Sequence, residues 1–410
     1  MSTGYVEFWG RTRIHCAAGA VVRLPSILQG LGAKRVLLVS DRGLVAAGLV
    51  DRVQRVFALN RSGNMPALAG TYAEVSQDAG SETVNAALAA ARACAADSIV
   101  ALGGGSVLDA AKGVKYGLAR GLTDIGEVLL SGLRLEIEER PLDVPHVAIP
   151  TTAGTGAEVT NGAVILNQAT GPKVLLAAPY LEADVAILDA QLTTGLPTWL
   201  TADSGMDALT HAIEVITSPA ASHFTDALAF NAIRVIERAL PRAVADGCDL
   251  QAREDMLQAA TMACLALANA LGAAPVHNCS HAFGAAAHVP HGRANGVLLP
   301  IVMEELREFY RPHAARLAGA FGIDACGQTP EVLLDRVIAR IRDLQMAIGM
   351  PRDFDGVAAV PVDPALVVRA ILTDPLAALY RISAERATAI VARALGVDTA
   401  MHTIILEGET

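Results

Sequence analysis

SIVALGGGSVLDAAK, residues 98–112, carries the most direct information about the fold. Ser98–Leu102 is a short, mostly apolar run that predicts a buried strand, and Val107–Tyr116 has the pattern of a helix. Between them, Gly103–Gly105 allow a sharp turn and a close approach of the backbone to a ligand. The free N–H groups at the start of the helix suit a phosphate. The spacing differs from the usual GxGxxG fingerprint, so a plain glycine-rich turn is the alternative.

The same alternation of strand and helix continues on both sides of this segment. Arg35–Ser40 and Pro145–Pro150 are further strand-like runs, and Thr83–Ala96 predicts a helix. Mostly apolar strands that alternate with helices indicate βαβ units and a parallel sheet. We therefore expect residues 1–197 to form a Rossmann-like α/β domain that binds a dinucleotide.

The pattern changes after Leu196-Pro197, where strand-like runs give way to long helical ones. The clearest helical patterns are Thr201–Thr217, Thr225–Ala239 and Ala252–Ala270. We therefore expect residues 198–410 to form an all-helical domain that binds metal and substrate.

Composition excludes several classes of function. Hydrophobic residues make up 52% of the 410 residues and charged residues 18%, which indicates a large buried core and favours a homo-oligomer. The net charge of −10, without a basic block, makes nucleic acid an unexpected partner. No apolar run reaches the roughly 18 residues of a membrane span, and the N-terminus lacks the pattern of a signal peptide. The six cysteines form no CxxC pair, which fits a reducing cytoplasm.

Two further features follow predicted strands and favour nucleotide binding. The loop Thr151–Glu158 places hydroxyls and small residues at the end of a strand, where ligands of open α/β sheets bind. Asp41 comes directly after another strand. A carboxylate there suits an adenosine ribose and repels the additional phosphate of NADP, although Asp is also a common helix N-cap.

Histidines gather in one short segment of the second half. His277, His281, His288 and His291 are four of the 10 histidines in the chain. Neutral imidazole is a common ligand of divalent transition metals, so the segment indicates a metal site. Upstream, Asp207 and His211 have the i, i+4 spacing that places two side chains on one face of a helix. Spacing alone does not tell which of the four histidines are ligands, and an ordinary surface Asp–His pair is the alternative for the upstream residues.

Taken together, these motifs resemble the iron-containing (group III) alcohol dehydrogenases. GGGSxxDxxK matches at Gly103–Lys112, PTTAGTGAE at Pro150–Glu158, DALTHAIE at Asp207–Glu214, and HxxxHxxGxxxxxPHG at His277–Gly292. The resemblance extends from near the N-terminus to about residue 350. His288 and the C-terminal stretch DPLAALYR, residues 374–381, depart from the family pattern, and the tail 401–410 is unfamiliar.

The resemblance implies a dehydroquinate synthase-like fold and a division of roles among the histidines. It makes Asp207, His211, His277 and His291 the metal ligands. His281 would lie beside the nicotinamide and the substrate as a catalytic residue, without binding the metal. We expect His288 to lie outside the ligand set.

The resemblance also implies the cofactors and the residues that contact them. NAD is expected in preference to NADP, together with Fe²⁺, although such ligands also accept Zn²⁺ or another divalent metal. The expected cofactor-binding residues are Asp41, Gly104, Gly105, Ser106, Asp109, Thr151, Thr152, Thr155, Lys173 and Leu192.

The implied reaction is a hydride transfer between the nicotinamide and a small alcohol or aldehyde, catalysed by a cytoplasmic homodimer. One alternative is a metal-dependent lyase on the related dehydroquinate synthase-like scaffold, which uses NAD without net turnover. Such an enzyme binds a phosphorylated substrate through basic residues, and the chain has no lysine from Val174 to Thr410. A silent metal-binding or nucleotide-binding protein is the third possibility, and the complete set of ligands argues against it.

Overall fold

The computed structural model describes residues 6–59, 63–130, 133–169, 173–355 and 362–397. The unfamiliar tail 401–410 lies outside this range. The chain divides into two units. The sheet unit contains Trp9–Leu196 together with Cys248–Thr261, and the helical unit contains Met1–Phe8, Pro197–Gly247 and Met262–Thr410. The units therefore do not follow a single cut at residue 197, because residues 248–261 pack with the sheet.

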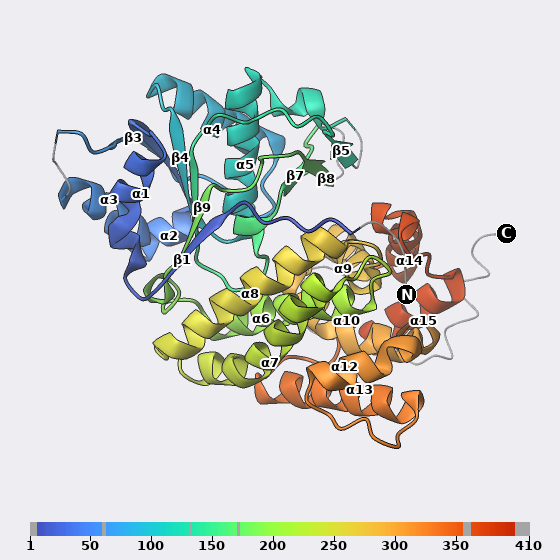
Figure 1. The fold of residues 1–410 in the computed structure, drawn as a ribbon. Coiled ribbons are helices and arrows are strands. Elements are labelled where there is room, and N and C mark those ends of the chain that lie inside the picture. Colours follow the sequence, from blue (N-terminus) through green and yellow to red (C-terminus); the bar gives the residue numbers. More distant parts are fainter. Residues whose placement is uncertain (1–5, 60–62, 131–132, 170–172, 356–361, 398–410) are drawn as a thin grey trace. The chain divides into compact units, whose positions relative to one another are not determined.

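A six-stranded sheet forms the centre of the sheet unit (Figure 1), and all of its neighbouring strands are parallel. In spatial order the strands are β1 (Arg13–Cys16), β9 (Val185–Leu188), β6 (His146–Pro150), β4 (Ser98–Gly103), β2 (Arg35–Val39) and β3 (Ala67–Tyr72). The expected parallel α/β sheet is confirmed, including the strands expected near residues 35–40, 98–102 and 145–150.

Both faces of this sheet are buried, because successive side chains of a strand point to opposite sides. In β2, Val36 and Leu38 belong to one apolar cluster, whereas Leu37 and Val39 belong to another. A parallel sheet covered on both faces needs strands that are apolar at every position. This requirement explains why these strands appear in the sequence as continuous apolar runs.

Helices and a small second sheet complete the sheet unit. The helices are α1 (Leu24–Gly30), α2 (Arg42–Ala46), α3 (Leu49–Leu59), α4 (Ser81–Ala93) and α5 (Gly105–Arg120). The second sheet has the order β5 (Leu133–Leu135), β8 (Lys173–Ala177) and β7 (Gly162–Leu166). Strand β8 is parallel to β5 and antiparallel to β7.

The described part of the helical unit contains helices and no strand, as expected. Its main helices are α6 (Thr198–Thr217), α7 (His223–Ala245), α9 (Pro275–Ala287), α10 (His291–Glu305), α12 (Ala314–Ala320), α13 (Pro330–Ala347), α14 (Pro364–Thr373) and α15 (Ala384–Ala394), with the short α11 (Arg307–Tyr310) between α10 and α12. Every residue of α6 from Thr201 to Thr217 is buried. A helix that is buried on all sides is a central one, so side chains from several neighbours can meet on it.

Helix α8 (Leu250–Ala270) contributes to both units, since its residues up to Thr261 belong to the sheet unit and those from Met262 to the helical unit. Among the described residues, no single helix is long and apolar enough to cross a membrane. Helices α8 and α9, which are bent by 105° at the break between them, are long and apolar enough only when they are counted together.

Candidate metal centre and cofactor-binding loops

Asp207 and His211 lie one turn apart on α6 and are both buried, with 2% and 6% of their surface exposed. The Oδ1 atom of Asp207 is 3.9 Å from the Nε2 atom of His211. Because the whole middle of α6 is enclosed, this pair is not the ordinary surface pair that spacing alone allowed. The helix instead presents a carboxylate and an imidazole inside the helical unit.

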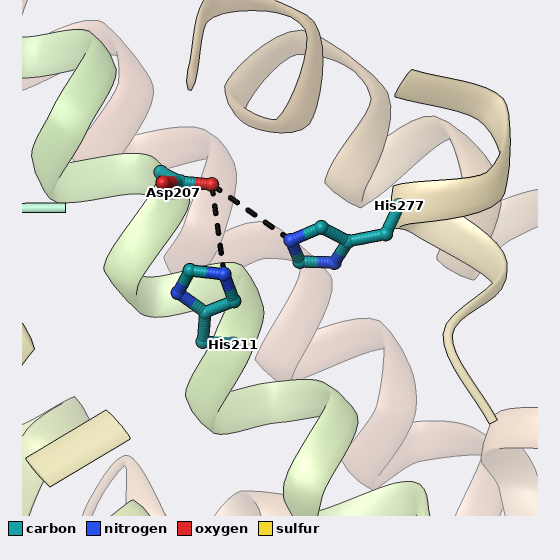
Figure 2. Close-up of side chains that lie close together, drawn as sticks. All are labelled: Asp207, His211 and His277. Atoms are coloured by element: carbon teal, nitrogen blue, oxygen red, sulfur yellow. Dashed lines mark ion pairs between the residues drawn. The ribbon is translucent and has the colours of Figure 1, made fainter. Parts of the chain in front are cut away.

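Two further histidines approach the same carboxylate from α9 and α10. His277 lies in the first turn of α9, and its Nε2 atom is 3.8 Å from Oδ1 of Asp207. His291 is the first residue of α10, and its Nε2 atom is 3.5 Å from the same oxygen. Figure 2 shows Asp207, His211 and His277 facing one another; ligand atoms of these three lie within 4.8 Å of each other. All four expected ligands are therefore brought together.

The chemistry of this group fits a divalent transition metal. It offers one carboxylate oxygen and three imidazole nitrogens, a donor set that suits iron or zinc. Burial alone would raise the pKa of Asp207, but the imidazoles of His211, His291 and His277 outweigh it and lower the pKa below its usual value. The carboxylate is therefore ionised and available as a ligand at neutral pH.

Glu214, on the same helix as Asp207 and His211, holds the far side of the His277 ring. Its Oε2 atom is 2.5 Å from Nδ1 of His277, and its Oε1 atom accepts a hydrogen bond of 2.7 Å from the backbone N–H of Val276. Burial raises the pKa of Glu214 to about 8 and lowers that of His277 to about 4. A partner on Nδ1 fixes the ring so that Nε2 faces the ligand group.

Asn295 is a second contributor that the sequence did not reveal. It lies on α10 one turn after His291 and is fully buried. Its Nδ2 atom donates to Oδ1 of Asp207 at 2.7 Å and is 3.2 Å from the Nε2 atoms of His277 and His291. The only sequence signal for Asn295 is its i, i+4 spacing from His291, whereas Glu214 stands at the end of the DALTHAIE motif.

The two remaining histidines of the segment have different surroundings. His281 has 37% of its side chain exposed, and its ring lies beside those of His277 and His291, with centroids 6.4 and 5.6 Å away. Its Nδ1 atom is 3.2 Å from Oδ2 of Asp374. His288 is exposed and ends α9 with a φ of 54°, which reverses the chain before Pro290 begins the next helix. Its exclusion from the ligand set stays a prediction.

In the sheet unit, the glycine loop (Gly103–Gly105) and the threonine loop (Thr151–Glu158) lie against each other. Gly103 of β4 pairs with Pro150 of β6, so both loops leave the sheet at the same edge. A Cβ atom added to Gly105 would lie 2.8 Å from Cγ2 of Thr155, and one added to Gly104 would lie 3.3 Å from Oγ1 of Thr152. Glycine is thus required for the two loops to approach so closely. Gly104 is the N-cap of α5, whose first N–H groups can bind an anion.

Asp41 lies at the same edge of the sheet, just after β2. Its Oδ1 atom accepts a hydrogen bond of 2.9 Å from the backbone N–H of Leu44, so it is the N-cap of α2. The helix-cap alternative is therefore confirmed. A carboxylate has a second oxygen, so capping and ribose binding are compatible.

The other expected cofactor-binding residues differ in the contacts that they make within the protein. Lys173 pairs with Asp78 (Nζ to Oδ1, 2.7 Å), and the N–H of Asp78 donates to Oγ of Ser106 at 3.2 Å, which links two of the predicted residues. Asp109 is bonded within the protein, to Lys112 through Oδ1 and to the backbone of β7 through Oδ2. Leu192 is buried in an apolar cluster of the sheet unit.

Two family models match the chain. The model of iron-containing alcohol dehydrogenases covers residues 11–190, and that of the C-terminal part of the Fe-containing alcohol dehydrogenase family covers residues 201–392. The chain belongs to the iron-containing alcohol dehydrogenase family. It is accordingly an oxidoreductase, a metal-dependent alcohol dehydrogenase linked to a nicotinamide cofactor.

Relatives within the iron-containing alcohol dehydrogenase family are similar over most of their length. The chain is 38% identical over 343 residues to long-chain-alcohol dehydrogenase 1 of Geobacillus thermodenitrificans, covering 83% of this chain and 84% of that protein. It is 39% identical over 327 residues to 1,3-propanediol dehydrogenase of Klebsiella pneumoniae, covering 79% and 81%. The crystal structure of a 1,3-propanediol oxidoreductase has a TM-score of 0.87 and 32% identity, covering 96% of this chain and all of the other.

Proposed function

We propose that this enzyme interconverts small primary alcohols or diols and their aldehydes, with NAD as the hydride carrier and Fe²⁺ as the metal. The observation that carries the proposal is the convergence of Asp207, His211, His277 and His291 from three helices. The relative named 1,3-propanediol dehydrogenase supports this class of substrate. The sheet unit would bind the cofactor and the helical unit the metal, which corresponds roughly to residues 1–197 and 198–410.

The four ligands would hold the metal, which when bound supplies polarisation of the substrate oxygen. Glu214 and Asn295 support two of these ligands through His277 and Asp207. We assign to His281 the transfer of the alcohol proton towards solvent, because its ring lies beside the ligand group and over a third of its side chain is exposed.

The cofactor would lie along the loop edge of the sheet and supply the hydride chemistry. Gly104, Gly105 and Ser106 begin α5 and suit the pyrophosphate. Thr151, Thr152 and Thr155 follow β6 at the same edge. The second oxygen of Asp41 would accept from the ribose and disfavour NADP. We further propose a cytoplasmic homodimer; the six cysteines form no CxxC pair, which fits the compartment, and the high apolar content favours an oligomer.

Two histidines, His277 within α9 and His288 at its C-cap, provide a matched test of the metal assignment. We expect the purified wild-type enzyme to bind one divalent metal per chain and to reduce NAD with small primary alcohols. His277→Ala should lose both properties, whereas His288→Ala, at the exposed end of the same helix, should keep both. Metal content by mass spectrometry and nicotinamide absorbance are the measurements. Full metal content and activity in His277→Ala would refute the assignment.

A further inference from the structure

The C-terminal stretch that departs from the family pattern, residues 374–381, begins with the residue that contacts His281. We propose that Asp374 is a positioning residue for catalysis, which accepts the Nδ1–H of His281 and thereby leaves Nε2 as the nitrogen that exchanges the substrate proton. The proposal rests on the role of His281 in the proposed function.

Asp374 lies at the junction of α14 and the short helix η6 (Pro375–Ala378), where its backbone and its carboxylate are both held by hydrogen bonds. Its backbone N–H donates to the carbonyl of Ala370 at 2.9 Å and so ends α14. Its Oδ1 atom accepts from the N–H of Leu376 at 2.8 Å and so caps η6. The Oδ2 atom remains, and it is 3.2 Å from Nδ1 of His281. The carboxylate therefore cannot turn away from the histidine without giving up its helix cap.

The exposure of the two side chains matches this division of roles. Asp374 has 11% of its side chain exposed, against 37% for His281. The contact with Asp374 is the one hydrogen bond of the His281 ring among the described residues. A shielded carboxylate thus orients a ring that is still accessible to a substrate.

The consequence for proton transfer follows from the chemistry of imidazole. In a neutral ring one nitrogen carries the proton and the other has the lone pair, and the partner of the first nitrogen selects between the two forms. A carboxylate only accepts, so Asp374 selects the form protonated on Nδ1. Its Nε2 atom can then take a proton from the alcohol or return one to the product.

Asp374→Asn tests the orientation of the His281 ring without removing the cap of η6. The amide oxygen must still face the N–H of Leu376, because an NH₂ group does not accept. The NH₂ group then faces Nδ1 of His281 and donates to it, which favours the form with the proton on Nε2. We expect a fall in kcat of about 10²-fold, the lower end of the usual contribution of acid–base catalysis, with little change in KM, melting temperature or metal content.

Asp363→Asn is the matched control. Asp363 precedes Pro364 and caps α14 through the N–H of Ala365 at 3.0 Å, as Asp374 precedes Pro375 and caps η6. No histidine bonds to Asp363 among the described residues, so its Asn variant should keep wild-type kinetics.

The double variant His281→Ala/Asp374→Asn should be no slower than His281→Ala alone. In protein labelled with ¹⁵N-histidine, the signals of His281 are those that disappear in His281→Ala. In Asp374→Asn these signals should move from the chemical shifts of the form protonated on Nδ1 towards those of the form protonated on Nε2.

The outcomes distinguish this inference from the proposed function. If His281→Ala is slow and Asp374→Asn retains wild-type kcat, the positioning role is refuted and the role of His281 stands. If Asp374→Asn slows His281→Ala further by the same factor, Asp374 acts elsewhere and the inference also fails. If His281→Ala turns over at the wild-type rate, the assignment of His281 itself is wrong. The unchanged metal content expected in Asp374→Asn is a readout that does not depend on turnover.

Discussion

His277 shows how one side chain serves two partners. Its Nε2 atom faces Asp207 and its Nδ1 atom faces Glu214, and both carboxylates come from α6. A histidine ligand binds metal well only when its ring is held with the lone pair pointing at the site, and a carboxylate behind the ring does this. The candidate metal centre therefore includes Glu214, although that residue does not belong to the proposed ligand set.

We accordingly expect Glu214→Gln to weaken metal binding by about 10- to 100-fold while the four ligands remain. The amide keeps the size of the side chain but cannot ionise to the carboxylate that would accept the Nδ1–H of His277 when a metal binds Nε2. Equilibrium dialysis against Fe²⁺ or Zn²⁺ measures the affinity directly. Glu308→Gln, on an exposed side chain paired with Arg311, is the control and should bind metal as wild type does. Wild-type affinity in Glu214→Gln would leave the residue with a packing role only.

Asp41 caps α2, and the proposed function also has it bind the adenosine ribose; a substitution can separate these two roles. Asn also caps helices, so Asp41→Asn should keep the bond to Leu44 and the wild-type melting temperature, yet lose the charge that opposes NADP. We expect the ratio of kcat/KM for NADP to that for NAD to rise about tenfold, equivalent to about 1.4 kcal/mol. Asp41→Gly should shift the ratio similarly and lose a few tenths of a kcal/mol of stability. A wild-type enzyme that already prefers NADP would contradict the assignment.

At the scale of secondary structure, the loops before α5 and after β6 depend on each other. The Cα of Gly105 faces Thr155 so closely that any side chain would collide with the methyl group of the threonine. The geometry of the glycine loop, Gly103–Gly105, is thus set by packing between two segments that are 50 residues apart in the chain.

Gly105→Ala should therefore weaken NAD binding and cost about 1–3 kcal/mol of stability, the usual penalty of overpacking. Thr155→Ser removes the methyl group at 2.8 Å and keeps the hydroxyl, so the double variant should recover much of both losses. Calorimetric titration with NAD and thermal melting are the measurements. No recovery in the double variant would mean that the alanine acts through the backbone of α5 and not through Thr155.

The elements that could be predicted are those whose local pattern has a single physical cause. Apart from their first residues, Arg35, Ser98 and His146, strands β2, β4 and β6 contain no polar side chain, because both of their faces are covered. Strands β1 and β3 lie at the edges of the sheet and keep exposed, mixed side chains, so their sequences resemble loops. Strand β9 is buried, but its four residues are too few to be distinguished from a turn of helix.

For the candidate site, too, the sequence predicted only what a local pattern determines. Spacing places His277 and His281 on one face of α9, yet it cannot tell which of them points at Asp207, since that depends on how α9 packs on α6. The resemblance to a family supplied that distinction. Glu214, Asn295 and Asp374 were not predicted because their partners His277, Asp207 and His281 are 63, 88 and 93 residues away in the chain, and no local pattern marks such contacts.

At the scale of the whole molecule, one buried group links stability to pH. His146 in β6 is fully buried, and neither ring nitrogen has a hydrogen-bond partner among the described residues. Burial, together with Lys115 and Lys112, lowers its pKa well below 6.5. The unfolded chain therefore takes up a proton below pH 6.5 that the folded chain does not, and the folded state loses stability as the pH falls.

We expect His146 to contribute about 1.4 kcal/mol of lost stability per pH unit below about pH 6. His146→Leu should remove this contribution, so its melting temperature should fall less between pH 7 and pH 5 than that of the wild type. His223→Gln, at the exposed start of α7, is the control and should follow the wild type. Parallel pH curves for the wild type and His146→Leu would show that this histidine is not the source of acid sensitivity.

Helix α8 belongs partly to each unit, and this limits how segments of this enzyme can be exchanged with those of its relatives. Leu257 of α8 packs on Ala186 and Leu188 of β9, and Thr261 donates a hydrogen bond of 2.6 Å to the buried Glu158. A gene fragment that starts at residue 198 would carry this piece of helix away from all of these partners. A chimera that takes the cofactor-binding half from a homologue must therefore exchange residues 248–261 as well. The two units of this chain are therefore built from interleaved segments of sequence and not from a front and a back half.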